Sequence, residues 1–232
     1  MAAGKDPVSA EDLLARLDAD PEWVRKRDES ARARRQRFEQ NRRCAEPLTE
    51  ALAAAGFDVS SVADLYNRRM TYEKAVPILL DWLPRIKTPA VKESVVRALT
   101  VKWARPAAAL PLIDEFCRVD DGSGTGLRWT IGNALAEVAD DSVFEDVAEL
   151  AEDRRWGRAR EMVVVALGNM REPRAVDVLR RLLSDDEVAG HAVIALGNAH
   201  AKEAREDIES LLEHPKTWVR KEASKALAKL DR

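Results

Sequence analysis

The sequence contains little of what several protein classes require. Only Cys44 and Cys117 are cysteines among 232 residues; two cannot build the disulfide framework of a small secreted protein, so we expect a reducing, cytoplasmic compartment. No stretch approaches the roughly 18 consecutive apolar residues of a membrane span, and no apolar signal core follows Met1, so we expect neither membrane insertion nor export. Glycine and proline number ten each, which excludes collagen-like and low-complexity chains. The composition therefore predicts a globular protein.

Helix-forming residues, by contrast, are abundant. Apolar side chains recur at spacings of three and four rather than two, and Ala, Leu, Arg and Glu dominate. An Ala-Leu pair returns at steps of 36, 32, 29 and 31 residues, a period typical of stacked helical units. The pairs are Ala98-Leu99, Ala134-Leu135, Ala166-Leu167, Ala195-Leu196 and Ala226-Leu227. A second apolar helix precedes each pair, so we predict a unit of an outer helix, a turn and an inner helix, present five times from about residue 72 onward.

Residues 1–71 depart from this repeat. We predict a charged helical extension over residues 1–45, with one helix starting at Ser9 and a second running from about Asp20 to Arg43. Residues 46–71 are interpreted as a degenerate capping hairpin, with helices at 46–55 and 61–69, at the start of a solenoid over residues 46–232. The predicted fold class is all-α, a right-handed α-α superhelix of about five to six helical hairpins with a helical N-terminal extension.

Three stretches of the repeat carry a family pattern. They are Ala166-Leu167-Gly168-Asn169, Ala195-Leu196-Gly197-Asn198, and Val219-Arg220 followed by Ala223 and Ala226-Leu227. On these residues the chain resembles the HEAT repeat family, and more closely its short bacterial form, the phycobilisome-lyase HEAT-like repeats. The resemblance covers roughly the C-terminal two-thirds of the chain and implies a binding scaffold. A minority of the family resemble lyases that attach bilins or enzymes that act on alkylated DNA bases.

A row of residues at four-residue spacing is expected on the inner helices, on the face opposite their core contacts. In the three central repeats it comprises Trp129, Asn133 and Glu137; Glu161, Val165 and Asn169; and Gly190, Ile194 and Asn198, with Arg97 and Lys225 as basic ends. His191 is a further candidate, at an inner-helix position that we expect to be exposed. If the inner helices line a concave surface, the apolar centre of this row predicts a binding site for a protein or peptide. The alternative is that curvature buries Val165 and Ile194 against adjacent helices.

A second periodic feature is basic. The position six residues before the repeat alanine is occupied by Lys92, Arg128, Arg160 and Arg220 in four of the five repeats. These cations could form a phosphate-binding ladder, or they could pair with acids in the preceding turns, such as Asp121, Asp153 or Asp186. We favour the structural interpretation, because a cation near a helix N-terminus opposes the helix dipole and requires a compensating acid.

Residues 22–43 hold nine Lys or Arg and four acids, a net charge of +5 against -8 for the remainder. Such a segment could guide an anionic partner such as nucleic acid. Alternatively, part of the charge forms pairs along the helix, and the seven-residue spacing of Val24, Ala31 and Phe38 forms a narrow apolar seam. Through that seam the helix could lie on the acidic repeats or on a second copy.

No motif predicts catalysis, a metal site or a cofactor. His191, His200 and His214 have no metal-ligand spacing with Cys, Asp or Glu, and no nucleophile elbow or dinucleotide fingerprint occurs. We therefore expect a non-enzymatic scaffold that binds a protein or peptide, with no cofactor and no membrane partner. The alternatives are nucleic-acid binding through the basic segment and the ladder and, from the resemblance alone, a bilin lyase-like protein.

Overall fold

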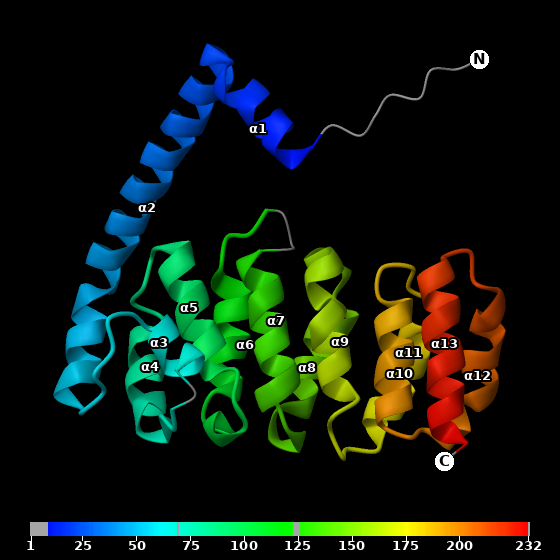
Figure 1. The fold of residues 1–232 in the computed structure, drawn as a ribbon. Helices are drawn as coiled ribbons and strands as arrows, with labels where there is room; N and C mark the ends of the chain where they lie inside the picture. The colour runs from blue at the N-terminus through cyan, green and yellow to red at the C-terminus, as the bar shows by residue number, and fades with distance from the viewer. Residues whose placement is uncertain (1–8, 69, 123–125, 232) are drawn as a thin grey trace, which may run out of the picture. The chain divides into compact units, whose positions relative to one another are not determined.

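Spacings of three and four produce the expected helices in the structure, a computed structural model that describes residues 9–68, 70–122 and 126–231. Every regular element in these ranges is a helix (Figure 1), so the predicted all-α solenoid is confirmed. The chain divides into two compact units, Met1–Glu46 and Pro47–Arg232. Residues 1–8 of the expected extension and Arg69 of the expected capping hairpin lie outside the described residues.

The N-terminal unit contains α1, Ala10–Asp18, and most of α2, Pro21–Ala54. Both helices begin where the sequence predicts. Ser9 Oγ accepts a hydrogen bond from Asp12 N at 3.1 Å, and Asp20 Oδ1 accepts one from Glu22 N at 2.9 Å. Side-chain oxygens at these positions satisfy amides that have no partner within the helix.

α2 is longer than predicted. The expected end near Arg43 and the separate helix at 46–55 are wrong, because one helix runs without interruption to Ala54 with Pro47 in its interior. Proline there removes a backbone donor and ordinarily breaks a helix. The residues that follow it are anchored nonetheless, since Leu48 and Leu52 lie one turn apart and are both buried in the core of the second unit.

The second unit is a stack of helical pairs (Figure 1). α3, Ala63–Asn67, packs against the first inner helix, and five pairs of one outer and one inner helix follow. The outer helices are α4 (Val76–Trp82), α6 (Ala109–Arg118), α8 (Phe144–Glu152), α10 (Arg174–Leu182) and α12 (Arg205–Ser210). The inner helices are α5 (Pro89–Leu99), α7 (Leu127–Val138), α9 (Glu161–Leu167), α11 (Ala189–Asn198) and α13 (Thr217–Leu230). Short 3-10 segments are η1 (Glu73–Ala75), η2 (Lys102–Ala104), η3 (Asp141–Val143), η4 (Arg154–Arg160), η5 (Lys202–Ala204) and η6 (Leu211–Glu213).

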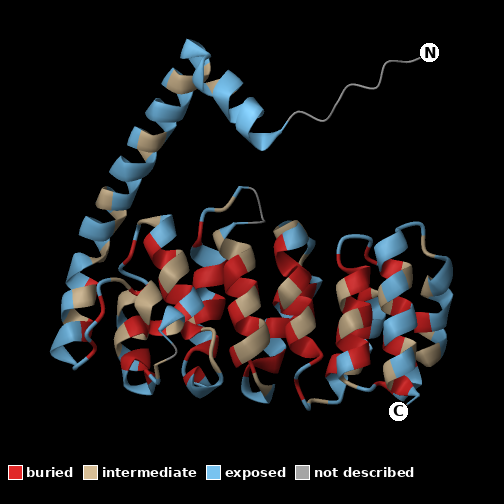
Figure 2. Cartoon of the chain, viewed as in Figure 1, coloured by how far each residue is buried: buried red, intermediate tan, exposed pale blue. Residues whose placement is uncertain are grey.

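Small residues let the inner helices stack closely, and the buried residues follow these helices along the stack (Figure 2). The five repeat alanines are 0–2% exposed. A Cβ added to Gly168 would lie 2.5 Å from the backbone of Ala195 in the next repeat, and one added to Gly197 would lie 3.0 Å from Ala226 Cβ. The repeated Ala-Leu-Gly motif therefore has a packing cause, because only small side chains permit these helices to approach so closely.

Candidate functional site

The residues of the predicted row lie on consecutive inner helices, except Asn169, which lies two residues beyond the end of α9. Trp129, Asn133, Val165, His191 and Ile194 are half-buried, Glu161 is buried, and Arg97, Asn169, Asn198 and Lys225 are exposed. Part of each Val165 and Ile194 side chain is thus covered by its surroundings, and part stays accessible. We call Trp129 on α7, Val165 on α9 and Ile194 on α11 the inner row.

Two asparagines of the predicted site connect neighbouring inner helices. Asn169 Nδ2 donates to the carbonyl of Ala136 at 2.9 Å, which satisfies an orphan acceptor at the C-terminal end of α7. Asn198 Oδ1 accepts a hydrogen bond from Lys229 Nζ on α13 at 2.8 Å. Both amides therefore hold consecutive repeats together, although both side chains are exposed beside the inner row.

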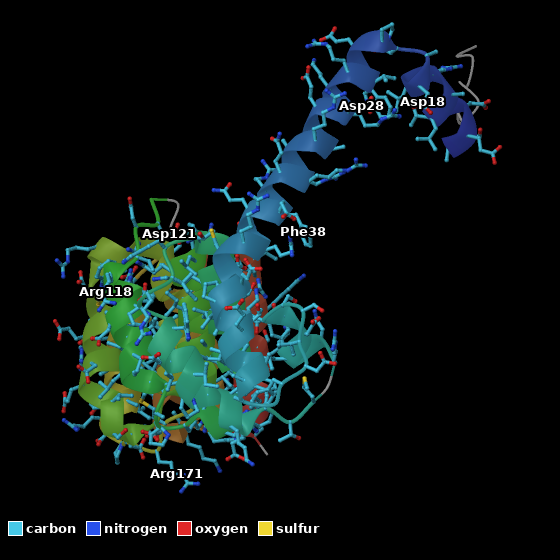
Figure 3. The ribbon with its side chains drawn as sticks, turned by 90° about the vertical axis from the view of Figure 1, so that its left-hand side faces the viewer. Asp18, Asp28, Phe38, Arg118, Asp121 and Arg171 are labelled. Carbon is cyan, nitrogen blue, oxygen red and sulfur yellow. The ribbon has the colours of Figure 1, made fainter. Side chains whose placement is uncertain are left out.

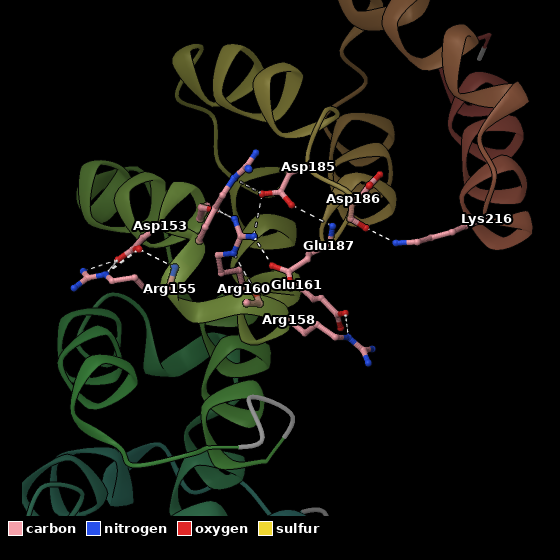
Figure 4. A network of polar contacts seen from close by, with 12 residues as sticks. Asp153, Arg155, Arg158, Arg160, Glu161, Asp185, Asp186, Glu187 and Lys216 are labelled. Atoms are coloured by element: carbon pink, nitrogen blue, oxygen red, sulfur yellow. Dashed lines mark hydrogen bonds and ion pairs between the residues drawn. The ribbon is translucent and has the colours of Figure 1, made fainter.

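Glu161 is a buried carboxylate at the start of α9. Its Oε2 accepts a hydrogen bond from Trp129 Nε1 at 3.3 Å. Its Oε1 accepts one from Arg158 Nε at 2.9 Å (Figure 4). Burying a carboxylate is costly unless it is paired and hydrogen-bonded, and here both oxygens have donors. Glu161 therefore fixes the indole of Trp129 in the inner row.

Trp218 is a member of this surface that the sequence analysis did not assign to it. It is 40% exposed and its ring lies across α11, because Gly190 leaves the space that a side chain would occupy. A Cβ on Gly190 would come within 2.0 Å of the indole. The ring centroids of Trp218 and His191 are 5.4 Å apart. Gly190, a glycine in the row, was the sequence signal that could have placed Trp218 on this surface.

Two of the four ladder cations, Lys92 and Arg160, are buried inside the stack. Lys92 Nζ donates a hydrogen bond to Glu115 on α6, and both side chains are buried. Arg160 is 0% exposed and donates to the carbonyl of Ala151 at 2.9 Å. Cations in such positions are not accessible to the phosphates of an external nucleic acid.

Arg160 connects its repeat to the following one. It donates to Asp185 Oδ2 at 3.0 Å and to Glu187 Oε2 at 3.1 Å (Figure 4). We expected Arg160 to pair with Asp153 of the preceding turn. The carboxylate of Asp153 instead accepts a hydrogen bond from Arg155 at 2.6 Å.

Arg128 and Arg220 are half-buried and bond mainly backbone carbonyls of their own repeats. Arg128 donates to the carbonyl of Phe116 at 2.9 Å, and its guanidinium lies 4.7 Å from the ring centroid of Trp156. Arg220 donates to the carbonyl of His214 at 2.7 Å rather than to Asp186. All four ladder cations are therefore engaged within the repeats.

Comparison with known families agrees with this architecture. A family model described as HEAT repeats matches residues 119–189 and 184–232, which contain α7 to α13. Residues 119–232 belong to the HEAT repeat family. No curated protein matches it. HEAT repeats generally mediate contacts between proteins, and HEAT repeat proteins are typically non-enzymatic scaffolds.

The ends of the predicted site on the HEAT surface are less basic than the sequence indicates. Arg97 forms an ion pair with Glu93 at 2.7 Å, and Lys225 forms one with Glu222 at 2.6 Å. Each pair joins neighbouring turns of one helix, where such contacts are exposed and weak. Both ends of the predicted site therefore carry paired charges.

The described residues contain neither a metal-ligand cluster nor a membrane-spanning helix. No group of three or more His, Cys, Asp or Glu side chains in residues 9–68, 70–122 and 126–231 is placed to hold a metal ion. Across the same residues, no helix combines the length and apolarity needed to cross a bilayer.

We expect His191 to make the stability of the HEAT repeats depend on pH. Burial lowers the pKa of its imidazole; nearby Glu161 opposes this shift and Arg158 adds to it. Nδ1 is buried without a hydrogen-bond partner among the described residues. The unfolded chain, with a His pKa of about 6.5, binds this proton more readily, so stability falls as pH falls below that value.

We expect His191→Phe, which keeps a ring against Trp218, to reduce this dependence. Urea denaturation at pH 7.5 and pH 5.5 would measure it, with the variant losing less free energy of unfolding than the wild type between the two pH values. Equal losses would show that His191 does not titrate differently on folding.

Proposed function

We propose that this HEAT protein is a non-enzymatic scaffold that binds a protein segment or peptide along the inner row. The observation that carries the proposal is that Trp129, Val165 and Ile194 remain partly accessible on three consecutive inner helices, whose other large apolar side chains are mostly buried. Partly exposed apolar side chains grouped in this way often mark protein interfaces. The general role of HEAT repeats supports the same function.

The spacing of the inner row suggests the size of the bound segment. Packed helices lie about 8–10 Å apart, so three consecutive inner helices span about 16–20 Å. An extended chain of about six residues covers that distance at about 3.3 Å per residue. The occupant is therefore a short segment with apolar side chains facing Val165 and Ile194 and an anchor against the indole of Trp129.

A non-enzymatic role agrees with how the polar groups near the row are used. The one buried carboxylate there, Glu161, already accepts hydrogen bonds from Trp129 and Arg158. Its role is to orient an aromatic ring. We place this binding in the cytoplasm, in keeping with Cys44 and Cys117, both of which are free and exposed thiols.

Ile194→Glu tests the site. A peptide would first be selected from a displayed random library against the full chain, and its dissociation constant measured by isothermal titration calorimetry. Placing a charge in the apolar centre should weaken binding about 10–30-fold, corresponding to about 1.4–2 kcal/mol. The peptide is chosen without reference to the inner row, so the result depends on where it binds.

Leu110→Glu is the matched control. Leu110 is 55% exposed on the outer helix α6, and the same substitution there should leave the affinity unchanged. Circular dichroism would verify that both variants keep their helical content. If Ile194→Glu unfolds the chain, Ile194→Ala becomes the deciding variant and should still weaken binding. Unchanged affinity in a folded Ile194 variant, or an equal loss in the Leu110 variant, would refute the proposal.

A further inference from the structure

α2 carries four arginines that are not paired. Arg32, Arg34, Arg35 and Arg37 are exposed and form no ion pair with any described residue. Other cations of the same helix are paired: Arg25 with Glu29, Lys26 with Glu22, Arg27 with Asp18, and Arg42 and Arg43 with Glu39. Residues 32–37 thus concentrate four uncompensated positive charges within about two helical turns.

These arginines lie on two flanks of the helix. At about 100° per residue, Arg32 and Arg35 lie about 60° apart on one flank, and Arg34 and Arg37 lie about 60° apart on the other. The centres of the two flanks are about 160° apart, close to opposite. A flat protein surface would contact one flank only. A groove with negative charge on both walls would contact both.

Uncharged side chains lie between the two flanks. Gln36 and Gln40 are exposed, four residues apart, and face one side between the flanks. The opposite side carries Ala31 and Phe38; Phe38, on α2 (Figure 3), is 71% exposed. The helix therefore presents an amide face with arginines along both edges, and an apolar face on its back.

We propose that residues 32–40 of α2 bind in the major groove of duplex DNA. That groove is about 12 Å wide and admits an α-helix, and phosphates line both of its walls. Arginines on two flanks can contact both walls while Gln36 and Gln40 face the base edges, where glutamine pairs with adenine. The segment is about 13 Å long, comparable to a single passage through the groove.

Acidic residues do not cancel this charge. Glu39, which lies near the flank of Arg32 and Arg35, accepts hydrogen bonds from Arg42 at 2.7 Å and from Arg43 at 3.3 Å. Asp28, one turn before Arg32, is bonded to Arg27 at 3.3 Å. The remaining residues of the segment are uncharged or basic.

The test is fluorescence anisotropy of a labelled 20-base-pair mixed-sequence DNA duplex with the full chain. Four phosphate contacts predict that affinity falls about 100-fold between 50 and 200 mM salt. Replacing Arg32, Arg34, Arg35 and Arg37 together with glutamine should reduce the slope of log affinity against log salt by about 3–4. Circular dichroism would verify that α2 remains helical.

A control variant removes four other cations from the same helix. Arg25→Gln, Lys26→Gln, Arg42→Gln and Arg43→Gln change the net charge equally, but these residues are already paired, so the slope should change by about one or less. An equal loss in the control, or no salt-dependent binding by the wild type, would overturn the proposal. Equally tight binding of duplex RNA of the same sequence would also overturn it, because the major groove of RNA is deep and narrow. Displacement of the DNA by polyglutamate at equal charge concentration would overturn it as well and would indicate an acidic protein partner. None of these outcomes depends on the inner row.

Discussion

Replacing Arg160 with methionine should lower the free energy of unfolding by about 3–5 kcal/mol, because it breaks a buried ion pair from one side. Arg160 has no exposed surface, and its guanidinium donates a hydrogen bond to Asp185 of the next repeat at 3.0 Å. Without it, the buried carboxylate of Asp185 keeps an ion pair only with Arg154, whose side chain is largely exposed. Urea denaturation followed by circular dichroism measures the loss.

Arg155→Met is the matched control from the same 3-10 segment. The Arg155 side chain is 79% exposed and pairs with Asp153, so its removal should cost less than about 1 kcal/mol. Similar losses in the two variants would refute the role assigned to burial.

The effect of Arg160 should depend on pH. Burial tends to raise the pKa of Asp185, but hydrogen bonds from Arg160 and from the Glu187 amide hold it below its usual range. A lowered pKa contributes stability above the unfolded value of about 3.9, and this contribution is lost as pH falls through the folded pKa. The difference in the free energy of unfolding between the wild type and Arg160→Met should therefore become smaller below about pH 4.

Gly168→Ala should also destabilise the protein, by about 2 kcal/mol. The added methyl group would lie 2.5 Å from both the Cα and the carbonyl oxygen of Ala195, so α9 and α11 would have to separate. Overpacking of this kind costs about 1–3 kcal/mol. The better helix propensity of alanine offsets at most about 1 kcal/mol of this cost. The steric overlap should therefore outweigh it, and the substitution should lower the free energy of unfolding. The midpoint of urea denaturation would measure the change.

Gly122→Ala provides the comparison for Gly168. A Cβ at Gly122 meets no atom within 4 Å, so that substitution should change the free energy of unfolding by less than about 0.5 kcal/mol. If Gly168→Ala behaved in the same way, the close approach of consecutive inner helices would not limit what this motif tolerates.

The repeat architecture was predictable because it is written in a local pattern. Gly168 faces Ala195 and Gly197 faces Ala226, each one repeat later, so the packing requirement recurs at the repeat period. The continuity of α2 was not predictable in this way. Pro47 is a local signal to end a helix, yet α2 continues through it, and Leu48 and Leu52 beyond it are buried.

The partners of the basic ladder show the same limit of local reasoning. The sequence suggests pairing each cation with an acid in the preceding turn. In the structure Lys92 bonds Glu115 and Arg160 bonds Asp185, which are 23 and 25 residues away. These acids belong to the next repeat and become neighbours only once the repeats stack. Partners separated by a whole repeat follow from tertiary structure.

Spacing assigned most of the candidate residues to the inner helices, but it did not predict how each side chain is used. Asn169 bonds the backbone of α7, and Asn198 bonds a lysine of α13. Trp218 is not at a row position of its own helix. Its ring is accommodated because Gly190 on the neighbouring helix leaves room for it. Spacing within one helix does not predict which side chain of the next helix covers it.

The most direct test of the proposed function is a crystal structure of the full chain bound to the selected peptide. We predict that the peptide lies across α7, α9 and α11, with apolar side chains against Val165 and Ile194 and one side chain against the indole of Trp129. A peptide seated on the outer helices, for example beside Leu110, with the inner row left uncovered, would contradict it.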